Sequence, residues 1–194
     1  AALRVCHRDG HWTWVRATLS PVRSNDGTIR HVIGELEDIT EQRAAENERR
    51  DQIERQQRHQ AAIVRIATHE AVANGPLDAA LEAITEIAAN ATNTARVGVW
   101  FLEEDGEVLR CAELFDGTSA RHETGAELAA SSYPAYFRAL EADRVVDAGD
   151  ARTDPRTREF LEDYLTPLGI SSMLDAPIRI RGRVAGVICL EHVG

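Results

Sequence analysis

Residues 172–193, SMLDAPIRIRGRVAGVICLEHV, decide the fold of the larger part of this chain. Two runs of mainly aliphatic residues flank Gly182, which is typical of a tight turn between antiparallel strands. Residues 96–115, RVGVWFLEEDGEVLRCAELF, show the same pattern and predict a second hairpin that turns at Asp105-Gly106. Together the two hairpins predict an antiparallel sheet.

Helical patterns lie between and before these strands. Gly75-Pro76 predicts a helix start with proline at the first helical position, and one apolar face follows at Leu77, Leu81, Ile84, Ala88 and Ala91. Ser132–Pro134 predicts the cap of a short helix that buries Tyr136, Phe137 and Leu140.

A short strand and a loop are predicted for residues 144–154. Asp154-Pro155 then predicts a further helix, whose apolar side consists of Phe160, Leu161, Tyr164, Leu165 and Leu168. This order of elements predicts an α+β fold in which helices pack on an antiparallel sheet.

Residues 1–38 predict three antiparallel strands with turns at Asp9-Gly10 and at residues 23–27. Three strands cannot enclose a core, so Trp12 and Trp14 are expected to need partners from sequence outside these residues. Because the chain begins without methionine and directly in a strand pattern, we expect it to be a piece of a longer protein.

Residues 39–73 predict one long charged helix. Asp38 can cap it, Glu41 completes a capping box, and no glycine or proline interrupts it. A heptad seam can be drawn through Ile39, Gln42, Glu46, Arg49, Ile53, Gln56, Gln60, Ile63 and Ala67. Most of these positions are polar, so the seam is too weak for a stable coiled coil by itself. Two interpretations stay open: a single solvated helix, and a parallel dimeric helix held by flanking domains.

Composition excludes several classes of function. All 22 basic residues are arginine, against 32 acids, and the net charge of −10 arises from residues 74–194. An acidic domain repels phosphate backbones, so nucleic acid is not an expected partner. Without lysine the chain cannot form a Schiff base. Its three cysteines lie far apart in strand patterns, which predicts reduced thiols in a cytoplasmic protein, and no apolar run is long enough to cross a membrane.

Two family resemblances cover nearly the whole chain. Residues 8–46, RDGHWTWVRATLSPVRSNDGTIRHVIGELEDITEQRAAE, resemble the C-terminal half of a PAS domain, with Asp38-Ile39-Thr40 as the exit signature into a signalling helix. Residues 61–194 resemble a GAF domain of bacterial sensor kinases and cyclic-dinucleotide enzymes. The stretches that carry this likeness are VGVWFLEEDG (97–106), YPAYFRAL (133–140), DARTDPRT (150–157), YLTPLGISSMLDAPI (164–178) and GRVAGVICLEHVG (182–194). The closing helix usual in that group does not follow.

These resemblances imply three segments: the last strands of a PAS domain (1–38), a signalling helix (39–73) and a GAF domain (74–194) whose first helix can begin near residue 61. They imply a sensory input and signal-transmission module, without catalysis of its own, that controls an output domain such as a histidine kinase. The alternatives are the input module of a diguanylate cyclase or phosphodiesterase, and a dimerising relay without ligand. A homodimer through the helical linker and the GAF helices is expected.

Candidate ligand-binding residues follow from the GAF resemblance and from strand alternation. They are Cys111, Tyr133, Tyr136, Phe137, Asp150, Arg152, Tyr164, Ser171, Met173, Asp175, Cys189 and Glu191. Asp150, Arg152 and Asp154 are interpreted mainly as loop-fixing and capping groups, with ligand contact as the alternative. Asp175 is expected either to face the ligand cavity or to hold a backbone turn. Candidate signal-transfer residues are Asp38, Thr40, Ile53 and Ile63.

The cofactor stays unknown, although some ligands can be set aside. Cys189 and Glu191 share a strand face from which His192 points away, so no metal site is expected. A bilin is held on a cysteine followed by histidine, which neither Cys111 nor Cys189 is, and cyclic-nucleotide GAF domains carry an Asn-Lys-Phe-Asp-Glu motif that needs lysine. Sulfoxide reduction requires a nucleophilic thiolate with a resolving partner, which two strand cysteines do not predict. Small apolar or amphiphilic molecules, haem, or no ligand remain open.

Overall fold

A computed structural model describes residues 2–103 and 106–194. The chain divides into two compact units, Ala1–Gln57 and Arg58–Gly194, and the division falls within one helix, α1 (Thr40–Thr68). Asp105, half of the turn predicted at Asp105-Gly106, lies outside the described residues.

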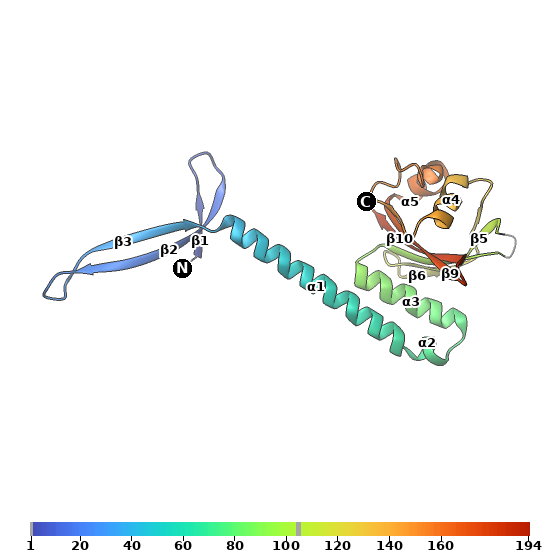
Figure 1. Cartoon of the computed structure of the whole chain (residues 1–194), viewed down its shortest axis with the longest axis horizontal. Coiled ribbons are helices and arrows are strands. Elements are labelled where there is room, and N and C mark those ends of the chain that lie inside the picture. Colours follow the sequence, from blue (N-terminus) through green and yellow to red (C-terminus); the bar gives the residue numbers. More distant parts are fainter. Residues whose placement is uncertain (1, 104–105) are drawn as a thin grey trace. The chain divides into compact units, whose positions relative to one another are not determined.

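The first unit contains the predicted antiparallel sheet of three strands, in the order β1 (Ala2–Cys6), β2 (Trp12–Arg23) and β3 (Ile29–Asp38) (Figure 1). Apolar side chains of the β2–β3 hairpin are exposed: Leu19 is 71% and Leu36 is 70% accessible. The buried residues of the sheet are Thr13 and Val15 of β2, and Val15 pairs with Asp38, just before the helix begins. The sheet therefore has no core of its own.

The long helix predicted for residues 39–73 is confirmed over most of its length, but it ends early. α1 begins at Thr40, and it stops at Thr68 because His69 adopts an extended conformation (φ −70°, ψ 130°). A short helix, α2 (Glu70–Asn74), follows and packs along α3 (Leu77–Thr92) (Figure 1). No helix-breaking residue stands at this point, so tertiary packing overrides the local helix propensity.

α3 starts one residue later than expected, with Pro76 as its N-cap rather than its first residue. Its buried side chains are Leu81, Thr85, Ile87 and Ala89, whereas Leu77 is 60% exposed. The predicted face was therefore partly wrong, because α3 packs against β4 and β5 with buried residues that begin only at Leu81.

The second unit is built on a sheet of seven strands in the order β6-β5-β4-β10-β9-β8, with β7 paired to β5. The strands are β4 (Arg96–Leu102), β5 (Val108–Asp116), β6 (Arg121–Glu123), β7 (Glu127–Ala129), β8 (Val146–Ala148), β9 (Ile170–Ile180) and β10 (Arg183–Val193). All of these pairings are antiparallel. Both hairpins are confirmed. β6 and β7 were missed because three residues are too few to show an alternating pattern.

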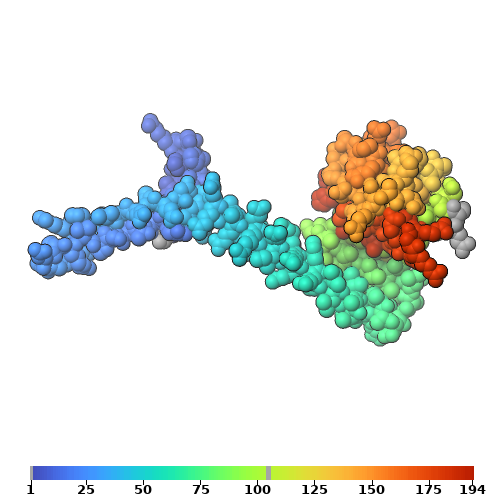
Figure 2. All heavy atoms as spheres, in the orientation of Figure 1, coloured from blue at the N-terminus to red at the C-terminus, as the bar shows by residue number. Residues whose placement is uncertain are grey.

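The two faces of this sheet carry different layers. On one face α3 packs through Ala88 and Ala89 against Val97, Phe115 and their neighbours on β10. The other face is covered by α4 (Pro134–Ala142) and by residues 158–168, the orange segments of Figure 2. This second layer encloses the larger core, and the predicted α+β class is confirmed.

The helix predicted to start at Asp154-Pro155 is wrong. Residues 150–157 form turns, and the helical part consists of a 3₁₀ segment η1 (Arg158–Phe160), a π-helical segment η2 (Leu161–Leu165) and one α-helical turn α5 (Thr166–Leu168). Thr157 donates to the carbonyl of Ala151 (2.8 Å), and the Asp154 carboxylate accepts from the Arg156 backbone (2.8 Å). These local bonds hold the chain in turns and delay the helix.

Candidate functional site

The candidate site lies on the sheet face beneath α4. Gly98 of β4, Cys189 of β10 and Asp175 of β9 are direct partners across three adjacent strands, so they form one row on that face. Trp100 folds its indole over the first position of the row: a Cβ added at Gly98 would lie 3.0 Å from Trp100 Nε1. A side chain at residue 98 would therefore require the indole to shift by a few tenths of an ångström.

Asp175 is the central polar group. It is fully buried, and its Oδ2 accepts a hydrogen bond of 2.6 Å from the hydroxyl of Tyr136, which α4 supplies. The same hydroxyl lies 3.8 Å from Cys189 Sγ. The second carboxylate oxygen, Oδ1, has no hydrogen-bond partner among the described residues, and neither has Trp100 Nε1. A buried acceptor and a buried donor therefore stand unpaired in one core.

Burial dominates the protonation of this row. Burial and the nearby carboxylate of Glu191 raise the pKa of Asp175 to about 7, although hydrogen bonds from Tyr136 and from the Cys189 thiol favour the ionised form. Burial, together with the nearby carboxylates of Asp175 and Glu191, raises the pKa of the Cys189 thiol. Burial also raises the pKa of Cys111 to about 12. Both thiols are therefore protonated near neutral pH and lack the thiolate that nucleophilic chemistry needs.

The next row holds a second polar cluster in which every member is paired. Glu191 is buried, and its two oxygens accept from Arg96 Nε (3.0 Å) and from the Tyr164 hydroxyl (2.7 Å). Arg96 also lies 3.7 Å from Asp116. This cluster ties β4, β10 and η2 together. Its groups already pair with one another.

The other predicted site residues divide between core and loop. Met173 is buried beside the row, Tyr133 packs on Phe160 with ring centroids 4.4 Å apart, and the Ser171 hydroxyl donates to the His192 carbonyl (3.3 Å). Asp150 accepts from the Arg152 backbone (3.1 Å), and the Arg152 side chain donates to the Ile170 carbonyl (3.1 Å). Asp150 and Arg152 thus fix the loop and do not reach the buried row.

Phe137 contributes to a separate apolar cavity of about 300 Å³ at one end of α4. The lining residues are Leu102, Gly106, Ala130, Phe137, Arg138, Leu140, Glu141 and Val184. No other predicted site residue belongs to it. The buried row and this cavity therefore share α4 as a wall but use different side chains.

Two of the predicted signal-transfer residues, Asp38 and Thr40, lie where β3 ends and α1 begins. Ile39 donates its backbone N–H to the Trp14 carbonyl (2.8 Å), and Trp14 donates its own to the Thr40 hydroxyl (2.9 Å). Asp38 Oδ1 accepts from the Thr40 backbone (2.9 Å), and the Arg43 guanidinium lies 4.0 Å above the Trp14 ring. The start of α1 is therefore clamped to β2.

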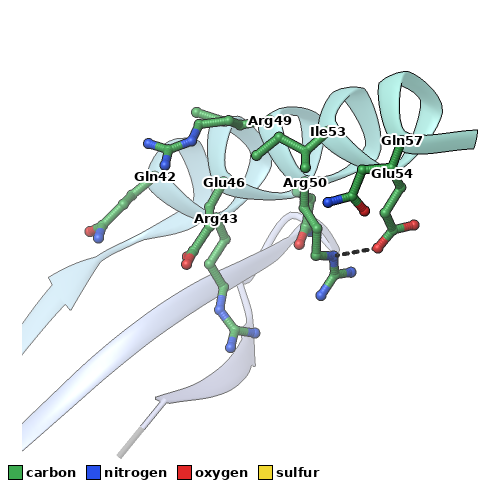
Figure 3. A pocket seen from close by; sticks show the side chains of 10 residues that line it. Gln42, Arg43, Glu46, Arg49, Arg50, Ile53, Glu54 and Gln57 are labelled. Atoms are coloured by element: carbon green, nitrogen blue, oxygen red, sulfur yellow. Dashed lines mark ion pairs between the residues drawn. The ribbon is translucent and has the colours of Figure 1, made fainter. Parts of the chain in front are cut away.

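A groove of about 1060 Å³ runs along α1 between Gln42 and Gln57 (Figure 3). Figure 3 shows Gln42, Glu46, Arg49 and Ile53 of the predicted seam beside the Arg50–Glu54 ion pair of 3.8 Å. Ile53 is 44% and Ile63 66% exposed. This face of α1 is polar and unpacked in a single chain.

Sequence reasoning missed Trp100 and Gly98, the donor end of the row. The signal was present, because a glycine inside an apolar strand marks a close approach of another group. Within residues 2–103 and 106–194, no three His, Cys, Asp or Glu side chains converge as metal ligands. Across the same residues, no helix is both long and apolar enough to span a membrane.

Comparisons with known proteins agree with this architecture. A family model described as GAF domain matches residues 76–194. The phycoerythrobilin-bound GAF domain from a cyanobacterial phytochrome is 18% identical at a TM-score of 0.59, covering 72% of this chain and 83% of that chain. The GAF domain of an Acinetobacter phosphoenolpyruvate-protein phosphotransferase is 14% identical at a TM-score of 0.51, covering 71% of this chain and 76% of that chain. The chromophore-binding domain of Stigmatella aurantiaca bacteriophytochrome is 15% identical at 0.56, covering 99% of this chain and 65% of that one. A comparison with curated proteins gave no match.

Proposed function

Since this chain belongs to the GAF domain family, we propose that it is a sensory input module that binds a small ligand beneath α4. The observation that supports ligand binding is the pair of unpartnered buried atoms, Asp175 Oδ1 and Trp100 Nε1. Leaving a buried polar group unpaired costs about 1–3 kcal/mol, so a bound molecule that pairs both would stabilise the folded state. GAF domains serve as sensory and regulatory modules, and the proposal assigns no catalysis to this segment.

Signal transmission through α1 is the second part of the proposal. Residues 1–38 resemble the last strands of a PAS domain, and the bonds of Trp14 to Ile39 and Thr40 would pass a movement of β2 directly to the helix. The weak seam on α1 would pair with the same seam of a second copy in a parallel homodimer. Few apolar contacts hold such a pair, so a small free energy can shift it between two states.

The output would be a cytoplasmic histidine kinase joined to this module. A diguanylate cyclase or phosphodiesterase is the alternative, since both use input modules of this kind. A relay that dimerises without any ligand is the third candidate, and it would leave the two buried atoms to water.

Native mass spectrometry of the chain, purified without denaturant, tests the proposal. Extra mass on each subunit that is lost on unfolding would support a ligand-binding sensor. A dimer mass with nothing bound would favour the relay, and a monomer at every concentration would contradict the paired α1 helices.

A further inference from the structure

We propose that the apolar cavity at one end of α4 is a binding site for a small uncharged molecule, built on an aromatic ring or a short hydrocarbon chain. This site goes beyond the proposed function, because none of Gly98, Cys189 and Asp175 lines it. It does not depend on whether that buried row pairs with a ligand of its own.

The helix and the sheet both contribute side chains to the cavity. Phe137 and Leu140 come from α4, whereas Leu102 stands at the end of β4 and Val184 near the start of β10. β4 and β10 are paired in the sheet, so Leu102 and Val184 lie on adjacent strands. Ala130, which follows β7, adds to the apolar wall. The cavity is therefore enclosed between the two layers of the second unit.

These walls leave apolar surface uncovered. Leu140 and Val184 are buried, but Leu102, Phe137 and Ala130 are only half-buried. The volume of about 300 Å³ lies within the range of small-molecule sites, which are mostly apolar. Water in such a space finds few hydrogen-bond partners, so an apolar molecule that displaces it gains free energy.

Hydrogen bonds hold both ends of α4, the helical wall of the cavity. At its first turn, Glu159 Oε2 accepts from the backbone of Ala135 (2.8 Å). At its last turn, the Arg179 guanidinium donates to the carbonyls of Leu140 (2.8 Å) and Glu141 (2.9 Å). The wall is therefore formed before any ligand arrives, and binding does not have to order it.

The charges at the rim favour an uncharged molecule. Arg138 and Glu141 of α4 both line the cavity and are exposed. They lie three residues apart on the helix, so they are neighbours of opposite charge. An ion would be attracted by one and repelled by the other, and it would lose hydration on entering an apolar space. The two buried polar atoms that lack partners among the described residues belong to Trp100 and Asp175, which do not line the cavity.

Four molecules that carry a phenyl ring on a three-carbon chain separate the charge classes: propylbenzene, 3-phenylpropanoate, 3-phenylpropylammonium and the zwitterion L-phenylalanine. Each is titrated into the full chain, in which the phenylalanines are isotope-labelled. The readout is the ring resonance of Phe137, one of four phenylalanines, assigned with Phe137→Leu. This signal reports binding at the cavity, because Phe137 lines it.

We expect propylbenzene to shift the Phe137 resonance saturably and to bind at least about tenfold more tightly than any of the three charged molecules, which must lose hydration. Equal or tighter binding of 3-phenylpropanoate or 3-phenylpropylammonium would overturn the uncharged class. Tighter binding of L-phenylalanine would do the same, since it would show that the rim holds a zwitterion. No saturable response to propylbenzene would overturn the site itself.

Leu102→Trp is the variant that fills the cavity, because the indole adds volume to a half-buried side chain in its wall. It should weaken the binding of propylbenzene at least about tenfold. Leu174→Trp, exposed on β9 and outside the wall, is the matched control and should leave the affinity unchanged. Equal affinities of the two variants would contradict binding in this cavity. If Leu102→Trp does not fold, the titration of the unsubstituted chain decides alone.

Discussion

At the scale of single residues, Gly98 leaves the space that the Trp100 indole occupies. The indole nitrogen sits where a Cβ at residue 98 would come within 3.0 Å, and Trp100 itself is almost fully buried. An extra methyl group in a closely packed core forces side chains from their preferred rotamers. The orientation of the free N–H therefore depends on a residue that has no side chain.

Gly98→Ala is accordingly expected to lower the free energy of unfolding by about 1–3 kcal/mol, because the indole must shift. The measurement is urea unfolding followed by tryptophan fluorescence. Gly149→Ala is the control, since a Cβ there meets no atom within 4 Å. Equal stability of the two variants would show that Trp100 is not held over residue 98.

At the scale of elements, His122 joins β6 to α3. Its Nδ1 lies 2.5 Å from Glu113 Oε1 and its Nε2 lies 3.3 Å from Glu86 Oε1. Thr85 donates to the same Glu113 oxygen (3.4 Å), and Glu82 adds a further negative charge nearby. Both ring nitrogens can donate only when the imidazole is protonated, so the link requires the cation. Burial lowers the pKa of His122, but the bonds to Glu113 and Glu86 outweigh it and raise the pKa above 6.5.

Because the folded state has the higher pKa, the stabilisation by His122 is complete below pH 6.5 and is lost as the pH rises through the raised value. We expect His122→Gln to cost about 1–2 kcal/mol at pH 6 and clearly less at pH 9. Urea unfolding at both pH values measures this difference. His59→Gln, on exposed α1, is the control and should show no such change. A pH-independent cost for His122→Gln would contradict the charged link.

A second prediction at the scale of elements concerns the heptad seam of α1. Ile53 and Ile63 are exposed apolar members of the seam, and lysine at both positions would place like charges opposite each other in a parallel pair. The double variant Ile53→Lys, Ile63→Lys should dissociate at a protein concentration at least about tenfold higher than the unsubstituted chain. Sedimentation velocity measures this. Ala44→Lys, exposed and off the seam, is the control, and unchanged sedimentation of the double variant would argue against the paired helices.

At the scale of the whole molecule, the two units differ in how much buried apolar core each contains. Residues 58–194 contain both apolar clusters, whereas the sheet of the first unit leaves its hairpin side chains exposed. A fragment of residues 58–194 should therefore unfold cooperatively at nearly the temperature of the full chain. A fragment of residues 1–57 should show no cooperative transition, because three strands and half a helix bury too little apolar surface. Calorimetry of both fragments checks this, and a cooperative transition in the shorter one would be the contrary result.

The sequence by itself determined the α+β class, both hairpins of the large sheet, the three N-terminal strands and the shared strand face of Cys189 and Glu191. Alternation along a strand and helix-forming composition are local properties, so they can be predicted without a fold. The break at His69, the late helix after Asp154 and the short strands β6 and β7 were decided by tertiary packing, which local propensity does not contain. The same holds for the site. Glu191 and Asp175 are similar carboxylates on two adjacent strands, yet Arg96 and Tyr164 satisfy one while Tyr136 leaves an oxygen of the other unpaired. That difference depends on which side chains strands and helices far apart in the chain bring together, so only the folded structure could reveal it.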